Sequence, residues 1–462
     1  MKSRYLLLFM FLSFAFCHPT AHGEGRSDTV TGTPPSGEVI SLRECLKRSL
    51  ENSPLIKTAI LDKTRSHYSY RETVGAALPQ VNFSGAWDDY LHLPTSLIPG
   101  EFFGRPGEML PVQFGTNFNI SAGLDVSQML YNQSWLVALK MARQALQQQD
   151  LNQEQAGIEV VYQVAQAYYL TQITRRQVRN MESNLEQIRK AAKIAQSQYE
   201  SGIIKKVDVD RIVIQQRNME TELDRLRVLY LQQLDMQKYF MGLSADKVIS
   251  LDDSIPTVSA PPTTAWNADN LIELRLIAKQ KEMVNSGIRL EQAGYYPSLT
   301  LIGSMNYMNQ SNTMYLLGKS NFWFNTSLVG IRLNVPLFSG LQRHYRVSQN
   351  KVNLEKLTVA EKDTREMLRI NSADALRRLA NSREAELSQR ENVKLAERVF
   401  SISREQYSKG IIPLTDLLTA ETALSDAQAN HTYALVQMKL AELAYLKANG
   451  RLMEIAGDQV TK

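Results

Sequence analysis

The sequence predicts a mainly α-helical protein with a membrane β-barrel portion, built from two similar halves. Three observations predict this fold: a duplicated turn motif, two long segments without helix breakers, and strand-like alternation at matching places in each half. Residues 198–208 read QYESGIIKKVD and residues 406–416 read QYSKGIIPLTD, 208 positions apart. The same shift relates Gly242 to Gly450, which end the segments after each motif. The chain therefore repeats one structural unit.

The two long segments predict helices over Gln133–Glu200 and Leu341–Ser408, each of 68 residues. Neither contains proline, and both are rich in residues that favour helices. A helix of this length extends about 100 Å. Gly202 and Gly410 follow the two helix ends, and we expect them in the left-handed conformation that commonly ends a helix.

Shorter helices are predicted on both sides of the long ones, over residues 41–77, 208–240, 267–295 and 416–449. Asp208 and Asp416 would begin two of them, where a carboxylate can cap free N–H groups and interact with the positive end of the helix dipole. The combined length of two short helices placed end to end is close to that of one long helix. Each half can therefore form a rod in which two short helices lie beside one long helix. The last helix has alanine at every seventh position, which indicates closely packed, supercoiled helices (Ala420, Ala427, Ala434, Ala441, Ala448).

Residues between each first short helix and each long helix alternate between apolar and polar. The clearest example is Val112–Val126, whose 15 residues exceed the ~9–11 that cross a bilayer as a tilted strand. We expect Val81–Trp87 to pair with it, and residues 299–307 and 321–335 to form the second hairpin. Four strands leave open edges that lipid cannot satisfy, so a membrane location requires at least two chains to close one barrel.

The first residues predict export. Lys2 and Arg4 precede a short apolar run, and a cleavage site before Glu24 defines a signal peptide over residues 1–23; lipid attachment at Cys17 is the alternative. The predicted organisation then continues with a flexible leader (24–40), a first repeat (41–242), a linker (243–265), a second repeat (266–450) and a C-terminal tail (451–462).

Composition excludes several classes of protein. Removal of Lys2 and Arg4 lowers the formal charge from +5 to +3, which gives no basic face for nucleic acid. Cys45 is the one cysteine left after the signal peptide, so no disulfide-stapled fold is expected. The six histidines lack metal-binding spacing, and Gly318-Lys319-Ser320 lacks the earlier glycine of a P-loop. No catalytic residue, cofactor or metal is therefore predicted, and an enzyme is not expected.

Short motifs from Ser41 to about Gly450 resemble those of the TolC-like outer-membrane efflux channels, the outer membrane factors. Each motif is short, and their order, spacing and duplication carry the resemblance: Ser41-Leu42, Asn52-Ser53-Pro54, Leu78-Pro79, Leu130-Tyr131-Asn132, Tyr296-Pro297, Pro336-Leu337-Phe338-Ser339-Gly340, and the paired Tyr-x-x-Gly turns.

The resemblance implies a homotrimer in the outer membrane, with a twelve-stranded barrel and an α-helical tunnel across the periplasm. Such a trimer would conduct solutes passively in a tripartite efflux or type I secretion system. Its partners would be a periplasmic adaptor and an inner-membrane transporter, with outer-membrane lipid around the barrel. From the residues alone, a soluble periplasmic coiled-coil scaffold is the alternative.

The same resemblance assigns roles to the repeated turns. Asp208 and Asp416 match positions that line the narrow periplasmic gate, where rings of acids favour cations; helix capping is the alternative role for both. Ile412 stands where an arginine tethers the closed tip in the family, and Thr419 stands where a second acid ring would lie. The closed tip would therefore be held differently here.

Two aromatic sets have open interpretations. Tyr199 and Tyr407, with Gly202 and Gly410, would form the adaptor-docking turns, whereas ordinary packing beneath a turn is the alternative for the tyrosines. An aromatic girdle at the membrane interface is predicted from Trp87, Phe322, Trp323 and Phe324, against the alternative of a strand core.

Overall fold

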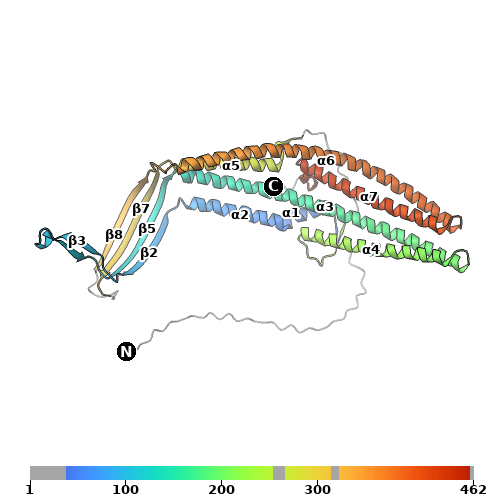
Figure 1. The fold of residues 1–462 in the computed structure, drawn as a ribbon, viewed down its shortest axis with the longest axis horizontal. Helices are drawn as coiled ribbons and strands as arrows, with labels where there is room; N and C mark the ends of the chain where they lie inside the picture. The colour runs from blue at the N-terminus through green and yellow to red at the C-terminus, as the bar shows by residue number, and fades with distance from the viewer. Residues whose placement is uncertain (1–37, 253–265, 314–321, 458–462) are drawn as a thin grey trace, which may run out of the picture.

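The chain forms an elongated rod with a β-sheet at one end and helices along the rest (Figure 1). This computed structural model describes residues 38–252, 266–313 and 322–457. Its helices are α1 (Leu42–Asn52), α2 (Pro54–Gly75), α3 (Gln133–Glu200), α4 (Lys206–Phe240), α5 (Ile272–Ala293), α6 (Gln342–Ser408) and α7 (Leu414–Ala448). Among the described residues, no helix is long and apolar enough to cross a membrane.

The two long helices are confirmed. Helix α3 has the predicted bounds, and the side chain of Asn132 caps its first turn by accepting a hydrogen bond from the Trp135 N–H. Helix α6 begins one residue later than predicted, because Leu341 adopts a left-handed conformation with φ 62° and is not helical.

The predicted helix over 41–77 is two helices, and the single-helix prediction was wrong. Ser53 separates α1 from α2 with an extended backbone (φ −56°, ψ 134°). The ring of Pro54 disfavours helical geometry in the residue before it, while proline itself suits the first turn of a new helix.

Helices α4 and α7 begin two residues earlier than predicted. Their N-cap residues are Lys205 and Pro413, and neither makes a side-chain capping bond. Asp208 and Asp416 therefore lie at the third helical position and are not caps, which corrects that expectation. Both carboxylates still lie in the first turn, where the helix dipole favours negative charge.

A four-stranded antiparallel sheet has the order β2–β5–β7–β8. Its strands are β2 (Gln80–Asp89), β5 (Phe118–Asn132), β7 (Ser298–Ser311) and β8 (Phe322–Asn334). The predicted pairing of the first two strands is confirmed, with Val81 opposite Val126.

The single strand predicted over Val112–Val126 was wrong. β4 (Met109–Gln113) ends before β5 begins, and it pairs with β3 (Thr95–Pro99) in a separate hairpin. Gly115, with φ 112°, lies between β4 and β5 in a conformation that favours glycine. The alternating pattern thus came from two strands, and β5 extends further toward α3 than expected.

The ends of the described chain are packed at the middle of the rod. β1 (Glu38–Ile40) pairs in parallel with β6 (Ile249–Leu251), so the last three residues of the predicted leader and part of the predicted linker are ordered strands. The predicted tail also packs through a 3₁₀ turn, Leu452–Ile455, in which Leu452 is buried. Residues 1–37, 253–265 and 458–462 lie outside the described residues.

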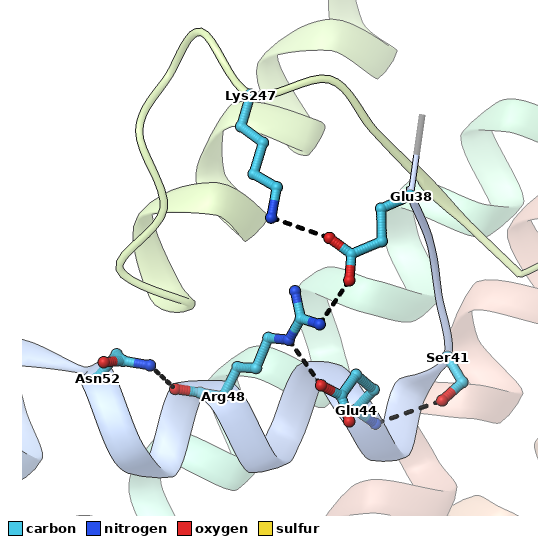
Figure 2. A network of polar contacts seen from close by, with 6 residues as sticks. All are labelled: Glu38, Ser41, Glu44, Arg48, Asn52 and Lys247. Carbon is cyan, nitrogen blue, oxygen red and sulfur yellow. Dashed lines mark hydrogen bonds and ion pairs between the residues drawn. The ribbon is translucent and has the colours of Figure 1, made fainter. Parts of the chain in front are cut away.

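A polar network holds β1 in place (Figure 2). The Glu38 carboxylate accepts from Arg48 at 2.5 Å and pairs with Lys247 at 2.9 Å. These two cations lower the pKa of Glu38 to about 2. The network joins residues before α1, within α1 and after α4, so it ties the N-terminal strand to the first repeat.

Short helices flank the long ones as predicted. Near the sheet, α2 packs on α3, α3 packs on α5, and α5 packs on α6. Beyond the middle of the rod, α4 packs on α3, α7 packs on α6, and α3 contacts α7. Two apolar cores result, one at the middle of the rod and one near the far end. The four strands and the four helices next to them form a wall one element thick. Its two edges, β2 with α2 and β8 with α6, have no neighbouring element among the described residues.

Candidate functional site: the paired helix turns

The turn between α3 and α4 is a Schellman motif. Gly202 has φ 73° and follows the C-cap residue of α3. The Ile203 N–H donates to the Gln198 carbonyl at 2.8 Å, and the Gly202 N–H donates to the Tyr199 carbonyl at 2.9 Å. These two bonds satisfy carbonyls that the end of the helix would otherwise leave free.

The turn between α6 and α7 repeats this geometry. Gly410 has φ 70°, the Ile411 N–H donates to the Gln406 carbonyl at 2.9 Å, and the Gly410 N–H donates to the Tyr407 carbonyl at 2.9 Å. A Cβ atom on Gly202 or Gly410 would meet nothing within 4 Å. Both glycines are therefore required for the backbone conformation and not for space, as the sequence predicted.

Both turns lie at the end of the rod that is farthest from the sheet (Figure 1). An apolar cluster from four helices packs behind them. Its buried members are Leu185, Ile188, Ala191 and Ala195 of α3, Ile212, Met219 and Leu223 of α4, Phe400 and Tyr407 of α6, and Leu414, Leu417, Ala420 and Leu424 of α7. The two turns thus belong to one packed unit within a single chain.

The two motif tyrosines have different environments. Tyr407 belongs to this cluster and is 2% exposed, whereas Tyr199 is 40% exposed. Burial, together with the negative charge of Asp208, raises the pKa of Tyr407. The Tyr407 hydroxyl lies near the first turn of α4 yet makes no hydrogen bond to the described residues. Packing therefore explains Tyr407 within one chain, and Tyr199 remains available to a partner.

The two motif carboxylates are accessible. Asp208 is partly exposed and lies 3.4 Å from the Arg211 guanidinium in the same helix. Asp416 is exposed, forms no side-chain hydrogen bond or ion pair within the described part of the chain, and donates its backbone N–H to the Pro413 carbonyl. Both side chains are thus on the surface of one chain and remain candidates for lining a narrow passage.

Sequence reasoning missed an apolar pair at the turns. Ile203 and Ile411 are 70% and 66% exposed, and each directly follows a helix-ending glycine. The signal in the sequence was the Gly-Ile-Ile repeated in both copies of the motif, which places an exposed isoleucine at the same position of each turn. Lys205 and Lys206 are also exposed, whereas Leu414, the counterpart of Lys206, is buried.

A buried carboxyl near the turns was also missed. Glu421 of α7 is 1% exposed, and one of its oxygens accepts a 2.6 Å hydrogen bond from the Gln215 amide of α4. Its other oxygen has no partner among the described residues. Burial raises the pKa of Glu421, and the Gln215 bond only partly opposes this.

At the other end of the molecule, strand register sorts the predicted girdle onto two faces. Trp87 is opposite Ile120, Ile120 is opposite Asn309, and Asn309 is opposite Trp323. Directly paired residues share a face, so both tryptophans lie on the same face of the sheet. Phe324 follows Trp323 and lies on the opposite face.

The two faces differ in character. The tryptophan face of β2 and β5 carries Val81, Phe83, Ile120, Leu124 and Val126, while the opposite face carries Asn82, Ser84, Asn119, Ser121 and Asp125. Trp87 and Trp323 therefore lie on one face and Phe324 on the other, so a girdle on a single face cannot contain all three. The side chain of Phe322 lies outside the described part of the structure.

Comparison with known proteins agrees with this architecture. Residues 45–235 and 270–451 match the sequence profile of the family described as outer membrane efflux protein. The outer membrane protein TolC of Vibrio cholerae is 24% identical over 448 residues, covering 90% of this chain and 91% of TolC.

Solved structures show the same fold. The outer membrane protein VceC of Vibrio cholerae superposes with a TM-score of 0.67 at 15% identity, covering 88% of this chain and 96% of VceC. The Campylobacter jejuni CmeC outer membrane channel gives a TM-score of 0.69 at 15% identity, covering 89% and 85%. The matching profile spans both repeats, so the chain belongs to the outer membrane efflux protein family and is a TolC-like outer-membrane channel subunit with a large periplasmic part.

Proposed function

We propose that three copies of this chain close one twelve-stranded barrel and one helical tunnel, which conduct solutes passively out of the cell. The observation that carries the proposal is the open sheet. β2 and β8 are each paired on one side only, and their outer edges present free backbone donors and acceptors. Such edges are not tolerated in lipid, and pairing of β2 with β8 of the next copy removes them.

The helical edges support the same closure. Exposed apolar residues recur at intervals of seven on α2 (Leu61 and Tyr68) and on α6 (Tyr345, Val352 and Val359). Near the sheet the helices lie in the order α2–α3–α5–α6, so α2 and α6 are the two edges of the wall. Seven-residue spacing is typical of a coiled-coil seam, and the α2 edge of a neighbouring copy would cover the α6 edge.

The sheet faces give the closed barrel an orientation. The face with Trp87 and Trp323 would contact lipid, with the two tryptophans as interfacial anchors, and the face rich in Asn, Ser and Asp would line the channel. Extracellular loops would then include the β3–β4 hairpin, which extends from the end of the sheet that is remote from the helices (Figure 1).

The turns would form the periplasmic entrance. Six turns would surround it in a trimer, with Asp208 and Asp416 toward the passage, where acidic rings attract cations. Gly202 and Gly410 shape the surface that a periplasmic adaptor would contact, with Tyr199 and the exposed Ile203 and Ile411 as contact residues. The adaptor would connect the duct to an inner-membrane transporter, which supplies the energy for efflux or type I secretion.

Recording from purified protein in planar bilayers tests the conducting role. We expect discrete conductance steps, and we expect Asp208→Asn and Asp416→Asn to lower the preference for cations measured by reversal potential. Asp210→Asn is the matched control, since Asp210 is an exposed carboxylate of the same helix turn. Absence of conductance from correctly folded protein would contradict the proposal.

Surface labelling of intact cells separates a channel from a periplasmic scaffold. Arg105 is exposed in the β3–β4 hairpin, so Arg105→Cys offers a thiol at the predicted outer surface. Cys45 is buried and does not interfere. An impermeant thiol reagent should label Arg105→Cys from outside, and labelling only after disruption of the outer membrane would favour the scaffold.

A further inference from the structure

An open groove of about 710 Å³ lies between α6 and α7, on the turn side of the apolar core at the middle of the rod. Small side chains of the seven-residue repeat line its α7 wall, including Ala434 and Ala441. Tyr162 of α3 also lines it, with the Lys447 ammonium 4.4 Å from the ring centroid. Ala434 and Ala441 thus lie at the groove wall, where their small size leaves room between the two helices.

Amide side chains and a tyrosine dominate the rest of the lining. Asn381 and Gln389 come from α6, and Asn430 and Gln437 come from α7. Tyr433 stands beside them and is 67% exposed, which is unusual for a large ring on a packed helix. Each amide offers both hydrogen-bond donors and acceptors.

The described residues give the groove little net charge. Arg378 is the charged residue among those that line it, and its Nε lies 2.7 Å from an oxygen of Asp374. Asp374 offsets much of the Arg378 charge, so the groove offers an ion little net electrostatic attraction. The lining therefore suits an uncharged ligand.

The exposed face of α7 indicates where the groove opens. Exposed residues follow one face of α7 at alternating intervals of three and four, namely Asp416, Thr419, Ala423, Asp426, Asn430, Tyr433 and Gln437. This periodicity places Tyr433 on the same side of the helix as Asp416. Under the proposed function Asp416 faces the conducting passage, so the groove opens into the tunnel.

We propose that the groove is a solute-binding subsite in the tunnel wall for uncharged, ring-containing solutes that carry hydroxyl or amide groups. Its volume lies within the range of small-molecule sites, roughly 300–1,000 Å³. The Tyr433 ring offers a stacking surface, and the four amides would pair with the polar groups of the solute. The inference rests on the proposed function, because it needs a tunnel whose interior includes the α7 face.

Three copies would place three such grooves at one height of the tunnel. Conduction requires that binding be weak enough for release, which suits an open groove better than a closed pocket. The expected signature is a brief, concentration-dependent interruption of the ionic current.

Orientation is tested first with Tyr433→Cys. Cys45 is buried, so the introduced thiol would be the accessible one in the mature chain. A bulky, charged thiol reagent added to a single open channel should lower its conductance in up to three steps. Thr422→Cys, on a residue beyond the groove, confirms that the reagent reaches the passage. Complete modification at Tyr433→Cys with unchanged conductance would place the groove outside the passage and overturn the inference.

Binding is tested with a matched pair of fluorogenic probes. 4-Methylumbelliferyl N-acetyl-β-glucosaminide is uncharged and carries a planar ring, hydroxyls and an amide, while 4-methylumbelliferyl phosphate has the same ring and an anionic group. We expect current interruptions from the uncharged probe and few from the phosphate. Tyr433→Ala should shorten the interruptions about fivefold, as expected for the loss of one aromatic contact, and Tyr433→Phe should retain them.

Further variants separate local binding from altered folding. Gln389→Ala, on the α6 side, should also shorten the interruptions, and Thr422→Ala should leave them unchanged. Normal conductance with no interruption, or with interruptions that Tyr433→Ala does not change, would overturn the subsite and leave the channel intact. Equal interruption by both probes would overturn its preference for uncharged solutes. Absence of conductance in the unmodified protein would instead contradict the proposed function.

Discussion

The α3–α4 and α6–α7 turns have nearly the same backbone and different side-chain environments. Both end in a left-handed glycine with the same pair of hydrogen bonds. Yet Tyr407 is buried against the other repeat, while Tyr199, at the equivalent position, is 40% exposed. The two copies of the motif thus share the residues that shape the backbone. Within one chain, however, other residues bury Tyr407 and do not bury Tyr199.

This difference indicates where a neighbouring copy would pack in the proposed trimer. Within one chain, residues of α3 and α4 help to bury Tyr407 of the second turn, while Tyr199 of the first turn stays exposed. In a ring of three chains, the first turn of one copy would meet the second turn of the next. Tyr199 would therefore be exposed in a single chain and buried once the ring of three chains is complete.

The largest expected effect distinguishes the two tyrosines. Tyr407→Ala should lower the free energy of unfolding by about 3 kcal/mol, because it leaves a cavity in the apolar cluster. Tyr199→Ala should lower it by less than about 1 kcal/mol in separated chains. Denaturation of both variants in detergent measures the difference. Equal losses in the assembled protein, with unequal losses in separated chains, would show that a neighbour buries Tyr199.

The glycines should respond alike. Gly202→Ala and Gly410→Ala should each cost about 1 kcal/mol of unfolding free energy, because alanine must adopt the left-handed conformation at an otherwise open position. Gly75→Ala, at an open position without positive φ, is the control and should be neutral or slightly stabilising. Clearly unequal costs at the two turns would contradict their equivalence.

We expect Glu421 to make the stability of the second repeat depend on pH. Its repeat counterpart, 208 positions earlier, is Val213. Since burial raises the pKa of Glu421 above its ordinary 4.5, its ionisation is opposed in the native state. Stability should therefore fall as the pH rises from about 4.5 through the raised pKa.

Glu421→Gln should remove this pH dependence and stabilise the protein at pH 7 by about 1 kcal/mol, since the buried charge is eliminated. Unfolding measured from pH 4 to pH 8 tests the sign. Glu397→Gln is the control, as Glu397 is exposed on α6. A variant with the same pH profile as the original chain would show that Glu421 does not control it.

The smallest expected effect concerns charge at the entrance. Lys205 and Lys206 are exposed at the first turn, where the second turn has Pro413 and Leu414. Replacing both lysines with glutamine should raise the cation preference by about twofold, because the acidic residues nearby are then less compensated. Reversal potentials measure this, with Lys193→Gln as the control. An unchanged preference would place both lysines away from the ion path.

Local chemistry explains why much of the fold could be predicted. The end of α3 was predicted from Gly202, because the left-handed conformation of a helix-ending glycine depends on the neighbouring backbone alone. The break before Pro54 also had a local signal, because proline disfavours helical geometry in the preceding residue. The prediction of one helix over residues 41–77 did not use that signal. In contrast, the division of Val112–Val126 into two strands depended on Gly115, since an alternating pattern continues across a turn of the right length.

The candidate site was less predictable because its side chains depend on distant packing. The motif marked Tyr199 and Tyr407 equally, and only the contact between repeats separates them. Glu421 resembles any surface carboxylate in sequence, yet α4 covers it. Strand alternation, which the sequence already contained, separates Trp323 from Phe324, whereas the register between strands was needed to put Trp323 on the same face as Trp87.

The central claim is that three chains close one barrel and one tunnel. The most direct measurement is the mass of the particle extracted by detergent from the outer-membrane fraction, determined by light scattering corrected for bound detergent. A particle of three chains is predicted, because the β2 and β8 edges then pair and the exposed first turns are covered. A monomer or dimer, or a detergent-free particle from the periplasm, would contradict the claim.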